Sequence, residues 1–282
     1  MISIDCKHPD IEEFINLKSK LGVCEKANIS VRVTDEFMKA AINDEDWVTE
    51  FDSPETGKIT RTFKAKDLLL LLAKRNWGYA EPGILYWDTI ENYNMLNNDE
   101  NFHYAGVNPC AEEPLPVFGA CLLGSLNLNK FVVDEFTPNA RIDYDELERA
   151  TAIAIAALNQ VLDEGIPLHP LKEQQEEVSK WRQVGLGTFG LGDAMIRMGL
   201  TYGSDESLKR AETIYSTIAK TSIEASLELS KKFGCYPKCN KEKLVESSFI
   251  KAMNLPENII KEIKEYGLRN SQLLTCAPTG LK

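Results

Sequence analysis

The stretch ISVRVTDEFMKAAI, residues 29–42, joins a strand pattern directly to a helix pattern. Residues 29–33 are rich in β-branched side chains and alternate with period two, which predicts a short strand. Thr34 is a good N-cap for the helix that follows, and Asp35 and Glu36 place negative charge in its first turn, where the helix dipole favours it. The stretch therefore predicts a strand that leads straight into a helix.

The first residues of the chain repeat this arrangement. Residues 1–6, MISIDC, have a second strand pattern, and residues 8–20, HPDIEEFINLKSK, predict a helix. The apolar side chains of that helix recur at helical spacing: Ile11, Phe14, Ile15 and Leu17. Two strand-then-helix units in succession are typical of β/α units whose strands lie parallel.

Strands and helices continue to alternate, less regularly, along the rest of the chain. The patterns predict helices over residues 65–80 and 143–163, helix-dominated structure over 173–232, and strands over 83–88 and 271–277. No internal repeat, low-complexity tract or clear linker divides the sequence. These elements together predict an α/β fold.

Composition and charge limit the kind of protein that this chain forms. With 282 residues, of which 43% are hydrophobic and 27% charged, the chain can bury roughly three quarters of its unfolded surface. The formal net charge of -11 argues against a general binder of nucleic acid or anionic membrane, because such proteins bind through excess lysine and arginine. The sequence has neither a signal-peptide pattern nor an apolar run of roughly 18 residues, so we expect a soluble cytoplasmic protein.

The seven cysteines are irregularly spaced and do not resemble the disulfide framework of a secreted protein. Cys235 and Cys239 form a CYPKC pair, but neither a second pair nor a nearby histidine completes a four-ligand zinc site. We therefore predict no metal site. Cys6, Cys24 and Cys276 are interpreted as small core or loop residues.

Residues 105–128, AGVNPCAEEPLPVFGACLLGSLNL, place an amide, a thiol and a carboxylate at alternate positions: Asn108, Cys110 and Glu112. In an extended stretch alternate side chains share one face, and Pro109 and the later prolines favour a stiff extended loop. A carboxylate beside a thiol disfavours the thiolate, which suggests a cysteine that acts in its neutral or one-electron form. The alternative interpretation is that these are ordinary loop residues around a buried cysteine.

Residues 185–193, GLGTFGLGD, contain the letters G-x-G-x-x-G of a dinucleotide-binding motif. That motif requires a strand before it and a helix that opens at its end. The preceding EQQEEVSKWRQV is polar and helical in character, so we interpret the segment as helical packing in which glycines permit close approach. The alternative, a nicotinamide-dependent oxidoreductase, predicts NADH binding that a substitution at Gly187 would abolish.

NPCAEEPL, residues 108–115, followed by CLLGSLNL, residues 121–128, resembles the catalytic finger loop and the next cysteine-bearing strand of the large, radical-bearing subunit of ribonucleotide reductase. Other stretches resemble that family in the same order: HPDIEEFI, NISVRVTDEFM, PGILYWDTI, RQVGLGTFGLGDAMIRMGL with YGSDES, and RNSQLLTCAPTG. The resemblance covers essentially the whole chain. It implies a ten-stranded α/β barrel made from two half-barrels, with the finger loop threaded through its centre.

The resemblance implies a chemical role for four residues. Cys110 resembles the cysteine that becomes a thiyl radical and abstracts the 3'-hydrogen of the substrate ribose. Glu112 resembles the base that takes the 3'-hydroxyl proton, and Asn108 the amide that hydrogen-bonds the ribose hydroxyls. Cys121 resembles one half of the reducing dithiol; its alternative interpretation is a core cysteine on a strand. The implied reaction reduces ribonucleotides, as diphosphates, to deoxyribonucleotides.

Two further segments resemble ligand-binding parts of the family. The first resembles the turn that receives substrate phosphates on backbone amides: Ala277, Pro278, Thr279 and Gly280. The second, within residues 19–28, resembles the loop that relays the identity of a nucleotide effector to the substrate base. Its candidate positions are Gly22, Val23, Cys24, Glu25, Lys26, Ala27 and Asn28.

The resemblance also implies a radical source. The pattern NPCAEEPL followed by CLLGSLNL most resembles the adenosylcobalamin-dependent class. The alternative class receives its radical from a separate di-metal subunit through a chain of tyrosines.

Compared with the family, residues 1–282 are expected to form a single incomplete catalytic barrel domain. We expect the N-terminal regulatory part, the first barrel strand with the partner cysteine of Cys121, and the C-terminal barrel part to lie on missing portions of the same polypeptide. The tail cysteines that thioredoxin or glutaredoxin reduces are expected there too. The isolated chain is therefore expected to be inactive, and the competing hypothesis is a structural or complementing fragment. Unpaired barrel strands favour self-association, including a homodimer.

Overall fold

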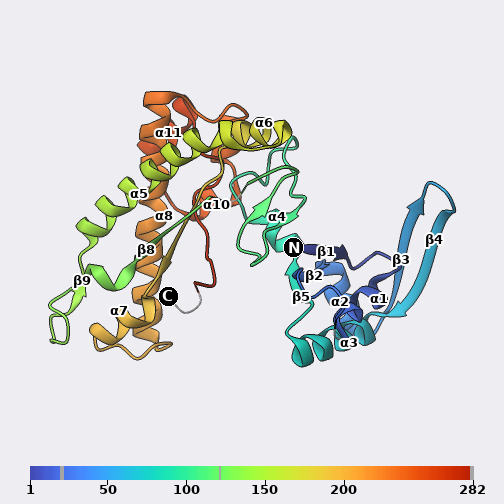
Figure 1. Cartoon of the computed structure of the whole chain (residues 1–282). Helices are drawn as coiled ribbons and strands as arrows, with labels where there is room; N and C mark the ends of the chain where they lie inside the picture. The colour runs from blue at the N-terminus through green and yellow to red at the C-terminus, as the bar shows by residue number, and fades with distance from the viewer. Residues whose placement is uncertain (20–21, 121, 280–282) are drawn as a thin grey trace. The chain divides into compact units, whose positions relative to one another are not determined.

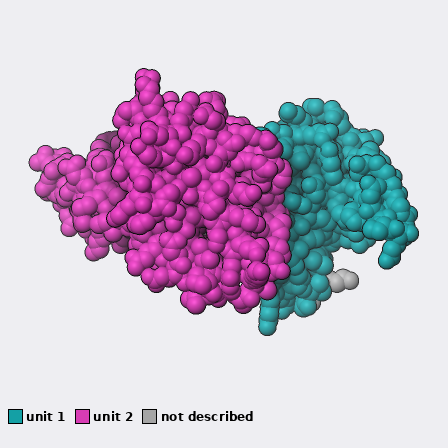
Figure 2. Space-filling model, turned by 90° about the horizontal axis from the view of Figure 1, so that it is seen from above, with its two compact units in different colours: residues 1–92, 106–114 teal, residues 93–105, 115–282 magenta. Residues whose placement is uncertain are grey.

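A computed structural model describes residues 1–19, 22–120 and 122–279 of the chain. The described residues form two compact units (Figure 2). Unit 1 comprises Met1–Asn92 and Gly106–Pro114, and unit 2 comprises Tyr93–Ala105 and the chain from Leu115 onward.

A three-stranded parallel sheet forms the centre of unit 1 (Figure 1). Its order is β1 (Ile2–Asp5), β2 (Ile29–Val33) and β5 (Gly83–Tyr86), with β2 in the middle. In the register, Ile2 lies opposite Ile29, and Ser30 lies opposite Gly83. The three strands predicted in this part of the chain, and their parallel direction, are confirmed.

The helices of unit 1 follow these strands along the chain. They are α1 (Ile11–Ile15), α2 (Asp35–Asn43), α3 (Ala65–Tyr79) and α4 (Trp87–Asn92). The helix predicted over residues 8–20 is shorter than expected, because the α-helix ends at Ile15 and only a 3₁₀ turn, Leu17–Ser19, follows. Asn16 ends it: its side-chain Nδ2 donates to the carbonyl of Glu12 at 2.9 Å, an asparagine-to-backbone bond that competes with helix continuation.

The N-cap predicted for α2 is present. The backbone N–H of Phe37 donates to Thr34 Oγ1 at 3.2 Å, and the helix ends at Asp44 in the left-handed conformation. The buried face of α2 contributes Phe37 to the core, where its ring meets that of Trp47 edge-on at 5.2 Å between centroids. The indole N–H of Trp47 in turn donates to the carbonyl of Cys6 at 2.8 Å, so the polar atom of this buried ring is satisfied.

Replacing Thr34 by alanine removes this cap, and we expect the free energy of unfolding of unit 1 to fall by about 1 kcal/mol, the usual value of a capping hydroxyl. Urea denaturation of the two proteins measures the difference. The control is Thr56→Ala, which alters an exposed threonine in a hairpin turn. Equal losses in the two variants would show that the capping hydrogen bond contributes nothing of its own.

A long hairpin that the sequence patterns did not predict extends from unit 1 (Figure 1). It consists of β3 (Asp46–Ser53) and β4 (Gly57–Lys64), paired antiparallel. Its base is tied to the core because Trp47 is buried, whereas most of β4 is exposed.

Unit 2 is built on a parallel pair of strands, β8 (Leu123–Asn127) and β11 (Gly185–Phe189), with Gly185 opposite Leu123. Its larger helices are α5 (Tyr144–Gly165), α6 (Lys172–Trp181), α7 (Leu191–Arg197) and α8 (Asp205–Phe233). Shorter elements complete it: β9 (Val132–Val133), β10 (Arg141–Ile142), α9 (Lys241–Val245), α10 (Ser248–Ala252) and α11 (Glu257–Tyr266). Helices α5 and α8 lie side by side (Figure 1).

The glycine-rich segment 185–193 is not the helical packing segment that we predicted. Residues 185–189 form β11, and Gly185 N–H donates to the carbonyl of Leu122 at 2.8 Å. The predicted close approach is confirmed: a Cβ added to Gly187 would lie 3.3 Å from Thr275 Cγ2. Since the first two glycines of the motif lie inside a paired strand, they do not form the phosphate-binding turn that a nicotinamide-dependent enzyme requires.

The segment predicted as a last strand, 271–277, is extended but, among the residues that the structure describes, forms a single β-bridge, between Leu274 and Leu186. It runs beside β11, where Leu186 N–H donates to the carbonyl of Leu273 at 2.8 Å and Thr275 N–H to that of Leu186 at 3.2 Å. The predicted extended geometry is therefore present over fewer residues than expected.

None of the helices in the described ranges is long and apolar enough to span a membrane. Within the same ranges, no three histidine, cysteine, aspartate or glutamate side chains gather in a way that could hold a metal ion.

Candidate functional site

Cys110 lies on a tight turn between two very short strands, β6 (Gly106–Val107) and β7 (Pro114–Leu115). Two backbone hydrogen bonds close the turn: Asn108 N–H donates to the carbonyl of Glu113 at 3.2 Å, and Ala111 N–H donates to that of Asn108 at 3.0 Å. The thiol-bearing residue is exposed at the tip.

This turn replaces the extended loop that the alternation of residues 108, 110 and 112 predicted. Ala111 has φ of 70°, in the left-handed region, so the chain reverses at the position after Cys110. Pro109 favours this reversal because its fixed φ suits the second position of a β-turn. The alternate-face argument is therefore wrong for this segment, although the three residues remain within one turn. The alternative interpretation of a buried cysteine is also wrong, because Cys110 is exposed.

The amide of Asn108 is oriented by the turn itself. Its Oδ1 accepts the backbone N–H of Glu113 at 3.0 Å. This bond fixes the orientation of the amide and uses one lone pair of the oxygen, and the Nδ2 group carries two donors that a ligand can accept. A donor fixed in this way suits a hydroxyl oxygen as partner.

Two carboxylates follow Cys110 in the turn. Glu112 is half-buried, and its Oε2 atom is shielded from solvent. The next side chain, Glu113, is 3% exposed. Glu112 is therefore the carboxylate that combines partial access with a position two residues from the exposed thiol.

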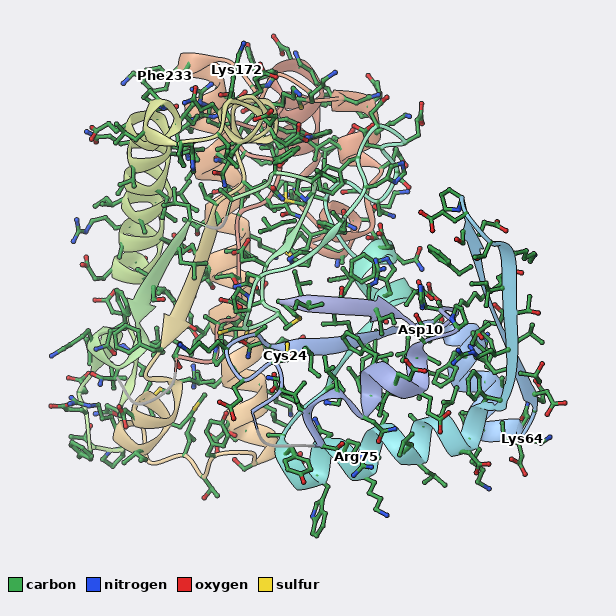
Figure 3. All side chains as sticks on the ribbon, turned by 45° about the vertical axis from the view of Figure 1, so that its right-hand side comes forward. Asp10, Cys24, Lys64, Arg75, Lys172 and Phe233 are labelled. Atoms are coloured by element: carbon green, nitrogen blue, oxygen red, sulfur yellow. The ribbon has the colours of Figure 1, made fainter. Side chains whose placement is uncertain are left out.

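The loop predicted to carry effector information, residues 22–28, is exposed in the middle and anchored at its end. Figure 3 labels Cys24 on this loop. Lys18 Nζ donates to the carbonyl of Ala27 at 2.5 Å and pairs with Glu81, whose other oxygen accepts Ile29 N–H at 3.1 Å. The exposed positions include Gly22, Val23, Glu25, Lys26 and Asn28, whereas Cys24 and Ala27 are half-buried. One ion pair thus fixes where the loop rejoins β2.

The predicted phosphate turn is described only in part. Ala277 and Thr279 are half-buried, Pro278 is exposed, and Thr279 has φ of 55°. Cys121 and Gly280, which we also predicted to act in the site, lie outside the described residues.

A buried polar network in unit 2 supports the segment that leads to this turn. Asn270 is 0% exposed and exchanges side-chain hydrogen bonds with Asn159 at 2.9 and 3.1 Å. Its Nδ2 also donates to the carbonyl of Arg182 at 2.9 Å, and its Oδ1 accepts Ser226 Oγ at 3.1 Å. The network ties residues 268–275 to α5 and α8.

Sequence patterns did not reveal this network. Asn159 lies at 5% exposure among the alanines and isoleucines of α5, and Ser226 is fully buried in α8. An asparagine at a core-facing position of an apolar helix was the available signal, because a buried amide requires a partner.

The parallel strands and the helices that connect them are those of a mixed α/β protein, and its exposed Cys110 thiol lies on a turn between an amide and a carboxylate. In comparison with known proteins, the family model for the ribonucleotide reductase barrel domain matches residues 1–281. The chain belongs to the ribonucleotide reductase barrel-domain family.

Several curated proteins of that family are similar to this chain. The chain is 34% identical over 235 residues to the vitamin B12-dependent ribonucleoside-diphosphate reductase of Thermoplasma acidophilum, covering 83% of this chain and 29% of the relative. It is 29% identical over 281 residues to the enzyme of the same name from Mycobacterium tuberculosis, covering 99% of this chain and 36% of the relative. A ribonucleoside-diphosphate reductase large chain from Neurospora crassa is 28% identical over 310 residues, covering 96% of this chain and 32% of the relative. The chain thus spans about a third of the length of the relatives it matches.

Proposed function

We propose that residues 1–282 form part of the catalytic barrel of a ribonucleotide reductase that converts ribonucleoside diphosphates to deoxyribonucleotides through a thiyl radical on Cys110. The observation that carries the proposal is the exposed Cys110 thiol at the tip of a turn, within two residues of both Asn108 and Glu112, in a chain of this family. Both compact units are part of one barrel domain in this proposal.

Three residues of the turn each have a role in the proposed reaction. As a radical, Cys110 takes the 3'-hydrogen atom of the ribose. Glu112 accepts the 3'-hydroxyl proton, and Asn108 donates from Nδ2 to a ribose hydroxyl, which holds the ring in place. A carbon radical beside an ionising hydroxyl expels the 2'-hydroxyl, which leaves as water with a proton from the reducing dithiol. The hydrogen-atom acceptor and the proton acceptor must therefore serve the same part of one ring.

Adenosylcobalamin is the proposed radical source, and the turn is compatible with it because the Cys110 thiol is open to direct approach. Bound against that thiol, the cofactor would supply the radical. The vitamin B12 dependence in the names of the relatives supports this source. A radical delivered from a separate di-metal subunit is the alternative.

The remaining assignments belong to the same proposal. Cys121 is one thiol of the reducing dithiol, regenerated by thioredoxin or glutaredoxin through other portions of the polypeptide. Residues 277–280 bind the substrate phosphates, and residues 22–28 respond to a nucleotide effector. The enzyme works in the cytoplasm, as a homodimer. The competing function is a structural or complementing role without catalysis.

Glu112→Gln tests the proposal in the complete polypeptide that carries this chain. The amide keeps the shape of the carboxylate but cannot accept the proton, so we expect kcat to fall by about 10²–10⁴-fold while substrate KM changes little. Formation of deoxyribonucleoside diphosphate under saturating substrate measures it.

The control is Glu55→Gln, which removes an exposed charge from the β3–β4 turn and should leave kcat unchanged. Full activity of Glu112→Gln would show that Glu112 is not the base that accepts the 3'-hydroxyl proton. Absence of any reductase activity in the unaltered complete polypeptide would favour the structural role.

A further inference from the structure

A second pair of cysteines lies in unit 2, away from the turn of Cys110 in sequence. Cys235 and Cys239 flank a tight turn after the end of α8, in which Cys239 N–H donates to the carbonyl of Tyr236 at 3.0 Å. Both thiols are free and half-buried.

A glycine from a later part of the chain makes room for the two side chains. A Cβ added to Gly267 would lie 2.9 Å from Cys235 Cβ, 2.9 Å from Cys239 Sγ and 3.5 Å from Cys235 Sγ. The two cysteine side chains therefore converge on one point above the glycine. Convergent side chains are the geometric condition for a disulfide between two cysteines.

The surroundings make the two thiols unequal. Arg269 lies close enough to Cys235 for an electrostatic interaction, and its guanidinium donates to the carbonyls of Phe233 and Gly234 at 3.2 and 3.1 Å. Burial raises the pKa of Cys239 to about 11, so this thiol remains protonated at neutral pH.

We propose that Cys235 and Cys239 form a thiol–disulfide exchange site, separate from the catalytic cysteines, that donates electrons to a small disulfide. The Cys235 thiolate attacks one sulfur of that disulfide, forming a mixed disulfide and releasing one thiolate. Cys239 then loses its proton and attacks Cys235 Sγ, which forms the Cys235–Cys239 bond and releases the second thiolate. Two electrons and two protons pass from the protein, and the small disulfide becomes two thiols.

Oxidised glutathione is the probe and is added to the reduced protein. The protein is then digested with trypsin, and the peptides are analysed for a disulfide. Cleavage after Lys232, Lys238 and Lys241 places the two cysteines on different peptides, FGCYPK and CNK. We expect the two peptides to be joined by a disulfide, with loss of iodoacetamide labelling at both cysteines that dithiothreitol reverses.

Two isosteric variants separate the steps. Cys239→Ser should accumulate glutathione on Cys235, because the resolving thiol is missing, and Cys235→Ser should leave Cys239 unmodified. Circular dichroism checks that both variants are folded. The proposal is overturned if the joined peptides are absent while exposed cysteines such as Cys110 and Cys276 become modified, or if Cys235→Ser still acquires glutathione on Cys239.

Discussion

Replacing Asn270 by alanine is expected to lower the free energy of unfolding of unit 2 by about 3–5 kcal/mol, because it leaves several buried partners unpaired. Asn270 is fully buried, and its amide satisfies the Asn159 side chain, the Arg182 carbonyl and the Ser226 hydroxyl. Each buried group left without a hydrogen bond costs about 1–3 kcal/mol. The methyl side chain of alanine has no polar atom that could restore these bonds.

Urea denaturation followed by the fluorescence of Trp181, which is 4% exposed in unit 2, measures this loss. The control is Asn139→Ala, an exposed asparagine whose backbone bond to Thr137 is retained. If both variants lose less than about 1 kcal/mol, the network is not what holds residues 268–275 against the helices.

The second large effect concerns Cys110. In the complete polypeptide, Cys110→Ser should reduce deoxyribonucleotide formation by at least about 10³-fold, since a group that acts in the chemical step cannot be replaced by its neighbours. A serine hydroxyl is close to the thiol in size, but its stronger O–H bond makes the corresponding radical much harder to form. Because Cys110 is exposed, stability should change by no more than about 0.5 kcal/mol.

We therefore expect Cys110→Ser to lose product formation, whereas its substrate binding and its free energy of unfolding should stay close to those of the unaltered protein. Cys235→Ser is the matched control: it removes one thiol at the exchange site and should retain turnover. Substantial turnover by Cys110→Ser would show that another residue carries the radical. If Cys235→Ser lost turnover while Cys110→Ser retained it, Cys110 would not be the catalytic thiol.

Sequence patterns predicted the elements in which side-chain periodicity and local signals agree. Residues 29–33 and Thr34 are one example, because β-branched alternation and a capping hydroxyl specify strand and helix without help from the rest of the chain. Strand β11 is the opposite case. Two of the five residues in its sequence GLGTF are glycines, which are depleted in strands, and the segment is a strand because β8 on one side and residues 272–275 on the other complete its hydrogen bonds.

The candidate site shows the same division. Resemblance to a known family identified Asn108, Cys110 and Glu112, but the turn that holds them depends on the left-handed Ala111 and on a side-chain bond within the turn. The network around Asn270 was beyond prediction for a different reason. Asn159 and Asn270 are 111 residues apart, and no local pattern shows that two distant amides will meet.

The pairing of β8 with β11 has a consequence for the order in which unit 2 forms. Two complete helices, α5 and α6, lie between the strands in the sequence, so the pair cannot close until the intervening chain has been made and collapsed. Contacts over such long separations are slow to form, because the entropy of a large loop is lost before the contact repays it. Helices α5 and α8 should therefore gain structure early on the folding pathway, and the edges of β8 and β11 should be the last surfaces of the unit to be covered.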